Sequence, residues 1–213
     1  SITTGNGTNK ITIDKDATAS KLATITLGNG TNTLDLSVSG SNLTVSGGNG
    51  TDNINLSGTN GKISTLNAGA NSTNISLKDN SNTITTINAN DKGSTINIAS
   101  GSGTIDKIAG KGGADSISVA KGNTIKDIET GTGAISIDGE GTITKVTVSQ
   151  NASGDISIGN GTKTTVTILQ TGNNGTSNQN INLANGSTIS TLEAKSGGAI
   201  TLNGNGEVTT LNL

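Results

Sequence analysis

The segment Ser72-Thr-Asn-Ile-Ser-Leu-Lys-Asp-Asn-Ser-Asn-Thr-Ile-Thr-Thr-Ile-Asn-Ala89 contains the pattern on which the fold depends. Its first half alternates polar and apolar side chains up to Leu77, which is the pattern of a strand with one buried face. Its second half places Ile84 and Ile87 three residues apart. Because the two residues between these isoleucines cannot both point outward on a flat strand, we expect a bulge or a corner there.

The same unit recurs along the whole chain at intervals of about 21 residues. The first element of each unit is an apolar-x-apolar pair, found at Ile11/Ile13, Leu34/Leu36, Ile54/Leu56, Ile75/Leu77, Ile96/Ile98, Ile117/Val119, Ile135/Ile137, Ile156/Ile158, Ile181/Leu183 and Ile200/Leu202. The second is a pair three residues apart, found at Leu22/Ile25, Ile63/Leu66, Ile84/Ile87, Ile105/Ile108, Ile125/Ile128, Ile143/Val146, Ile189/Leu192 and Val208/Leu211. Each unit is therefore expected to form two short strands.

Turns between the strands are marked by Asn-Gly dipeptides, in which both residues tolerate positive φ. Such dipeptides are typical of antiparallel hairpins, but they also fit a β-solenoid whose coils stack in parallel. Equivalent positions share residue type from unit to unit, as parallel in-register stacking requires. We therefore predict one all-β domain over residues 1–213, a parallel β-solenoid of about ten coils and a candidate segment of a longer repeat protein. Small residues at Ala68, Ala89, Gly110 and Ala194 predict that one corner of the coil is narrow.

The composition excludes several classes of function. The 213 residues include no His, Cys, Pro, Met or aromatic residue, and the net charge is -2. Imidazole bases, thiol nucleophiles and the usual zinc ligands are therefore missing, and we predict that the protein is not an enzyme. The acid pair Asp138 and Glu140 is interpreted as turn residues. No positive field or stacking platform for nucleic acid is present, and no apolar run is long enough to span a membrane.

Two turns carry a motif. The segment Gly47-Gly48-Asn49-Gly50-Thr51-Asp52-Asn53-Ile54-Asn55 matches every fixed position of GGxGxDxUx, and Gly110-Lys111-Gly112-Gly113-Ala114-Asp115-Ser116-Ile117-Ser118 is close to it. Both resemble the calcium-binding nonapeptide of RTX proteins. The resemblance implies calcium held by glycine carbonyls of these turns together with the carboxylates of Asp52 and Asp115, since calcium prefers oxygen ligands.

The column of equivalent turn positions that includes Asp52 and Asp115 consists mostly of neutral residues. This predicts isolated calcium ions and not a continuous row of ions along the solenoid. Eight of its ten predicted positions lack a carboxylate, the column being Asn9, Asn32, Asp52, Thr73, Ser94, Asp115, Gly133, Gly154, Gln179 and Gly198. The preferred interpretation is that Asp52 and Asp115 are solvated turn residues without a metal.

Composition and periodicity over the whole chain resemble the Thr/Ser/Asn/Gly-rich β-solenoid regions of Gram-negative surface-layer proteins of the RTX secretion group. The resemblance implies secretion, a location at the cell surface, and assembly with copies of itself into a lattice or fibre, with a cell-surface component as a second partner. Both ends of the chain lie in mid-pattern, which predicts strand edges that pair end to end. The alternative is the rigid stalk of a surface adhesin.

One outward column is rich in threonine, at Thr83, Thr104, Thr124, Thr142, Thr165 and Thr188. Regular threonine arrays on a flat solenoid face resemble ice-binding proteins, which is a third interpretation. Charged residues such as Asp106 and Lys126 interrupt the array, and threonine is common on the solvent face of strands. Stacking of like side chains from coil to coil is the preferred interpretation of this column.

Overall fold

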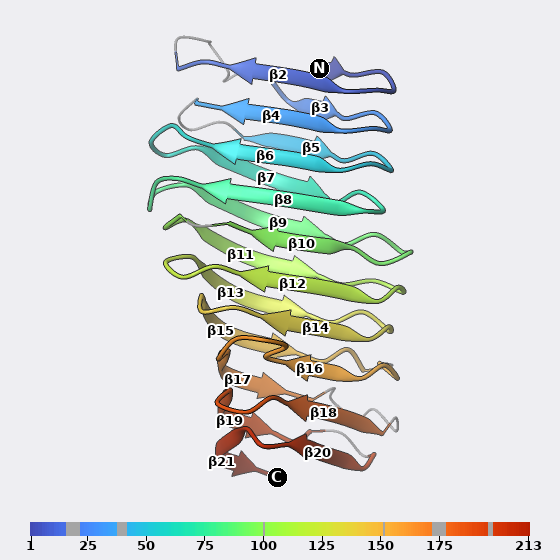
Figure 1. Ribbon diagram of the computed structural model, residues 1–213, viewed down its shortest axis with the longest axis vertical. Helices are drawn as coiled ribbons and strands as arrows, with labels where there is room; N and C mark the ends of the chain where they lie inside the picture. The colour runs from blue at the N-terminus through green and yellow to red at the C-terminus, as the bar shows by residue number, and fades with distance from the viewer. Residues whose placement is uncertain (16–21, 38–41, 100, 151, 172–177, 196–197) are drawn as a thin grey trace.

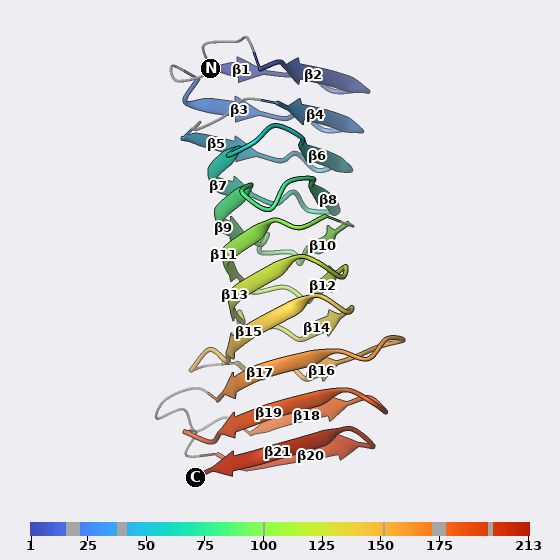
Figure 2. The same ribbon diagram turned by 90° about the vertical axis from the view of Figure 1, so that its left-hand side faces the viewer.

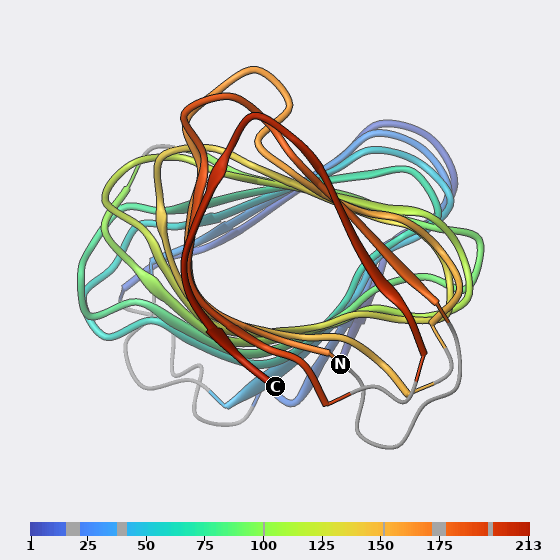
Figure 3. The same ribbon diagram turned by 90° about the horizontal axis from the view of Figure 1, so that it is seen from below.

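The chain folds into an all-β parallel solenoid of about nine turns with about 21 residues per turn, as a computed structural model shows. The structure describes residues 1–15, 22–37, 42–99, 101–150, 152–171, 178–195 and 198–213. The coils are stacked along one long axis, with the two termini at opposite ends (Figure 1). The predicted fold class is confirmed. Viewed along the axis, the coils surround one common interior, and later coils are rotated relative to earlier ones (Figure 3).

Each coil contributes one strand to each of two parallel sheets. Sheet A has eleven strands: β1 (Ile2–Thr3), β3 (Thr24–Thr26), β5 (Leu43–Ser46), β7 (Lys62–Asn67), β9 (Thr83–Asn88), β11 (Thr104–Ala109), β13 (Thr124–Glu129), β15 (Thr142–Thr147), β17 (Thr165–Gln170), β19 (Thr188–Glu193) and β21 (Glu207–Asn212). Sheet B has ten: β2 (Asn9–Ile13), β4 (Asn32–Leu36), β6 (Asp52–Leu56), β8 (Ser72–Leu77), β10 (Thr95–Ile98), β12 (Asp115–Val119), β14 (Ile135–Asp138), β16 (Ile156–Ile158), β18 (Gln179–Leu183) and β20 (Ile200–Gly204).

The interior is a stack of Ile, Leu and Val side chains from both sheets. In sheet A, Ile84 and Ile87 of β9 are both fully buried although they lie three residues apart. The pairing of β9 with β11 passes over Thr85 and Asp106, so the expected corner is a bend inside a continuous strand. Burying one such side chain stabilises the fold by about 1.5–3 kcal/mol, and stacking repeats this gain in every coil.

The register of sheet B differs from the sequence alignment of the units at three places. Ile96 pairs with Thr73 and not with Ile75, because β10 is displaced by two residues against β8. A second displacement of two residues pairs Asp115 with Ile135, and a third pairs Gln179 with Ile200. Since side chains alternate with a period of two, such a shift keeps every isoleucine on the inward face. The hydrophobic pattern therefore does not distinguish the two registers.

The prediction of a narrow corner is wrong. Backbone hydrogen bonds between coils at this corner align one column, whose members are Thr4, Leu27, Gly47, Ala68, Ala89, Gly110, Thr130, Val148, Thr171 and Ala194. Leu27 and Val148 are buried there with exposed fractions of 2% and 1%. The corner thus has room for branched side chains in at least these two coils.

Outward side chains form hydrogen-bonded ladders along the axis, as the sequence predicts. The Asn74 side-chain amide donates to Asn53 Oδ1 at 2.9 Å, and the Asn97 amide donates to Asn74 Oδ1 at 2.9 Å. The Asn88 amide donates to Asn67 Oδ1 on sheet A in the same way. These amides satisfy one another between coils, which adds to the backbone hydrogen bonds of the sheets. No helix long and apolar enough to cross a membrane occurs in the described part of the chain.

The last coil exposes side chains of columns that are buried elsewhere. Leu211 pairs with Leu192 in sheet A, yet Leu192 is 1% exposed and Leu211 is 53% exposed. Leu202 of β20 is 46% exposed. This end surface is a cross-section through the apolar interior, on which a further coil would find both an apolar face and unpaired strand edges.

Candidate functional site

The two motif aspartates point into the solenoid. Asp52 at the start of β6 is fully buried, and Asp115 at the start of β12 is 5% exposed. Each carboxyl group lies over the first glycine of its motif: a Cβ on Gly110 would lie 3.0 Å from Asp115 Oδ2, and a Cβ on Gly47 would overlap Asp52 Oδ2. These glycines leave the space that Leu27 and Val148 fill in other coils. The interpretation of Asp52 and Asp115 as solvated residues is therefore wrong.

Asp52 is the third member of an interior amide ladder. The Asn9 amide donates to Asn32 Oδ1 at 2.9 Å, and the Asn32 amide donates to Asp52 Oδ1 at 2.9 Å. Asp52 Oδ2 and Thr73 Oγ1, which belong to paired residues, are both buried without a hydrogen-bond partner. Burial raises the pKa of Asp52, while the Asn32 side-chain amide and the nearby Gly48 backbone amide lower it. The Gly48 amide does not form a full hydrogen bond to Oδ2, which is buried without a partner.

Asp115 has a similar environment three coils further on. The Ser94 backbone amide donates to Asp115 Oδ1 at 2.9 Å. Burial raises the pKa of Asp115, while the backbone amides of Ser94 and Lys111 lower it. Because Asp115 pairs with Ile135, the predicted continuation of its column to Gly133 and Gly154 is wrong.

The structure does not bring the two aspartates together. Three coil steps of about 4.8 Å separate them, and no cluster of three or more His, Cys, Asp or Glu that could hold a metal ion occurs among the described residues. Gly48, Gly50 and Gly113 lie against the backbones of Gly28, Gly30 and Gly93 in the adjacent coil, where a Cβ would clash. Gly112 has more room, because a Cβ on it would lie 3.6 Å from its nearest neighbour, Asp91 O. Calcium at Gly47, Gly48, Gly50 and Asp52, or at Gly110, Gly112, Gly113 and Asp115, stays a prediction.

The predicted threonine column is aligned in the structure. Its pairings run from Thr83 through Thr104 and Thr124 to Thr142, and from Thr165 to Thr188. The neighbouring columns on β11 and β13 carry charges instead. Lys126 Nζ lies 2.7 Å from Asp106 Oδ1, and Lys107 is paired with Glu129. The face of sheet A therefore combines a hydroxyl column with internally neutralised ion pairs.

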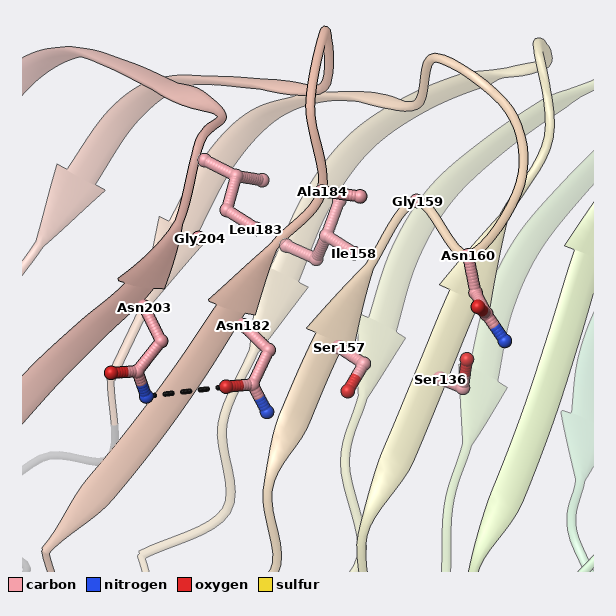
Figure 4. A pocket seen from close by; sticks show the side chains of 10 residues that line it. All are labelled: Ser136, Ser157, Ile158, Gly159, Asn160, Asn182, Leu183, Ala184, Asn203 and Gly204. Carbon is pink, nitrogen blue, oxygen red and sulfur yellow. Dashed lines mark hydrogen bonds between the residues drawn. The ribbon is translucent and has the colours of Figure 1, made fainter.

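A hollow that the sequence interpretation missed lies on the outward face of sheet B, at the ends of β14, β16, β18 and β20 (Figure 4). Its volume is about 550 Å³. Ser136, Ser157, Asn182 and Asn203 line it in one register row. The signal in the sequence is the run of Ser and Asn at equivalent positions of successive units, together with a long connection after β16.

This connection, residues 159–164, extends further from the stack than its neighbours (Figure 2). Asp138 fixes it: the Thr162 hydroxyl donates to Asp138 Oδ1 at 2.6 Å, and the Gly139 amide donates to the same oxygen at 2.9 Å. Thr164 Oγ1 lies 3.4 Å from it. Burial alone would raise the pKa of Asp138, but the hydrogen bonds from Thr162 and Gly139 hold it below its ordinary value. Asp138 thus holds the connection 159–164 against the end of β14.

Replacing Asp138 by alanine is expected to release residues 159–164, because the loop loses the acceptor that binds it to the end of β14. Proteolysis with a broad-specificity protease should then cleave within these residues faster than in the unmodified chain, while the core strands stay protected. Glu140→Ala is the matched control, since Glu140 lies two residues away and is exposed. Equal cleavage of the two variants would show that Asp138 does not hold the loop.

Comparison of the chain with models of known protein families, with curated proteins and with solved structures found no match. No family or relative therefore identifies the chain as an RTX or surface-layer protein. The resemblance of its two glycine-aspartate turns to RTX repeats stays a prediction.

Proposed function

We propose that this protein is an extracellular structural rod that assembles with copies of itself into a cell-surface layer or fibre. The observation that supports the proposal best is the way the coils stack: each coil is joined to the next by parallel strand pairing in two sheets and by a shared interior of Ile, Leu and Val side chains. The interactions that stack one coil on the next would then also join one rod to another.

The outward faces fit a structural role. Asparagine side chains are hydrogen-bonded into ladders. On β11 and β13, Asp106 is paired with Lys126 and Lys107 with Glu129, while Asp127 accepts a hydrogen bond from the Thr147 hydroxyl. Many polar groups on these faces are thus already hydrogen-bonded or ion-paired within the chain. A rod of this kind resists local unfolding because every coil is held by its two neighbours.

Electron microscopy of the purified chain in chelator and in millimolar calcium tests the proposal. We expect sheets or filaments, and a requirement for calcium would support the surface-layer assignment in particular. Isolated rods in both conditions would contradict self-assembly and favour the adhesin stalk, in which the same rod holds a separate binding module away from the cell.

Calcium binding has its own test in the two motif turns. If Asp52 and Asp115 hold calcium, the ion should raise the melting temperature of the chain, and Asp52→Asn together with Asp115→Asn should abolish that rise. Asp14→Asn is a control, because Asp14 is an exposed acid outside the two motifs and forms no hydrogen bond or ion pair with either of them in the described part of the chain. A calcium-induced rise that persists in the double variant would exclude these two turns as the binding sites.

A further inference from the structure

The hollow at the ends of β14, β16, β18 and β20 has features of a binding site that neither the rod proposal nor the calcium motif uses. We propose that it binds a neutral saccharide chain laid along the solenoid axis. The inference does not depend on self-assembly, since the hollow opens on the outward face of sheet B (Figure 4), although β20, which borders it, is the last strand of that sheet.

The floor of the hollow offers unused hydrogen-bonding groups. Among the described residues, the hydroxyls of Ser136 and Ser157 have no hydrogen-bond partner. Asn203 donates to Asn182 Oδ1 at 3.2 Å, which leaves the Asn182 amide hydrogens directed to the hollow (Figure 4). Hydroxyl and carboxamide groups both donate and accept, which is what the hydroxyl groups of a sugar require.

The spacing of these groups is set by the sheet and not by flexible loops. Ser136, Ser157, Asn182 and Asn203 come from four adjacent paired strands, so they repeat along the axis at about 4.8 Å. A ligand that satisfies several of them at once must itself present polar groups at regular intervals. An extended chain of sugar units does so, and a compact small molecule reaches only one or two of the strands.

Backbone and one small side chain form the rest of the hollow. Ala184 lines it beside the polar row, whereas Ile158 and Leu183 are buried and turn their side chains into the interior of the solenoid. The carbon-bound hydrogens of a pyranose ring can pack against the Ala184 methyl group. The volume of about 550 Å³ lies in the usual range of small-molecule sites.

Charge selects the class of saccharide. None of the residues that line the hollow is ionisable, and Lys163 of the connection 159–164 lies along Gly186. Asp138 lies next to the hollow, and its hydrogen-bonded carboxylate would repel an anion. These features favour a neutral chain over an acidic one.

The wall of the hollow is held in place before any ligand binds. Asn160 lies on the connection 159–164, which Asp138 binds through the Thr162 hydroxyl and backbone amide. Binding therefore does not have to order this loop, which reduces its entropic cost. Asp138 is a positioning residue for the site.

Titration of the full chain with neutral gluco-, manno- and galacto-oligosaccharides, followed by amide chemical shifts in NMR spectra, tests the proposal. We expect shifts confined to the lining residues for at least one of the three sugars, and weaker binding of acidic oligogalacturonate. Shifts elsewhere on the rod, no shifts up to the solubility limit of the sugars, or preferential binding of oligogalacturonate would each overturn it.

Two variants locate the site and one serves as a control. Asn182→Val and Ser157→Val each remove a polar group from the row, so each should weaken binding about tenfold. Thr33→Val makes a matched change on the outward face of β4, far along the stack, and should bind like the unmodified chain. Melting curves confirm that each variant is folded. Unchanged affinity in both folded site variants would contradict the assignment.

Discussion

Replacing Gly50 by alanine is expected to lower the free energy of unfolding by about 2–3 kcal/mol, because the added methyl group overpacks the contact between two coils. A Cβ at Gly50 would lie closer to the carbonyl oxygen of Gly30 than real Cβ atoms approach any neighbour. The obstacle is backbone, so no side chain can rotate away, and the coils must separate locally. Denaturant unfolding followed by circular dichroism measures the loss.

Gly112→Ala is the matched control for this prediction. Gly112 is also a motif glycine, but the nearest atom to its added Cβ, Asp91 O, is 3.6 Å away, which is an ordinary contact. The variant should be as stable as the unmodified chain or slightly more stable, because alanine restricts the unfolded chain more than glycine does. If Gly50→Ala and Gly112→Ala unfold at the same denaturant concentration, close coil stacking is not the reason for glycine at position 50.

The second large effect concerns Asp52, whose replacement by asparagine is expected to stabilise the fold at neutral pH by about 1–3 kcal/mol. An asparagine would continue the interior ladder of Asn9 and Asn32 without a buried charge. Burial raises the pKa of Asp52 above its ordinary value of 3.8. The folded state therefore binds the proton more tightly than the unfolded state, and this contribution to stability is present at low pH and is lost as the pH rises through the folded-state pKa.

The difference in stability between Asp52→Asn and the unmodified chain should thus be near zero below pH 3.8 and grow towards neutral pH. Asp35→Asn is a control of opposite sign. The Asn55 amide, which donates to Asp35 Oδ1 at 2.7 Å, lowers the pKa of Asp35, so that variant should lose stability at neutral pH and recover it in acid. A destabilised Asp52→Asn at pH 7 would show instead that the charged Asp52 is stabilised in the folded state.

Much of the candidate site could not be derived from the sequence. The motif identified Asp52 and Asp115, but their burial depends on Gly47 and Gly110 lying beneath them, and a linear pattern does not show which way a turn side chain points. The hollow on sheet B was missed because its floor comes from strands of four different coils. Its wall depends on the hydrogen bond from Thr162 to Asp138, across 24 residues of sequence.

The sequence by itself determined the number of strands in each coil, the repeat of about 21 residues and the inward set of Ile, Leu and Val, because these follow from alternation within one unit. It also determined the outward asparagine ladders, since like residues recur at equivalent positions. Only the tertiary structure decided the register, with Thr73 opposite Ile96 and Asp115 opposite Ile135. A shift of two residues leaves the pattern of buried and exposed side chains unchanged, so contacts between coils must select among registers that a single strand cannot distinguish.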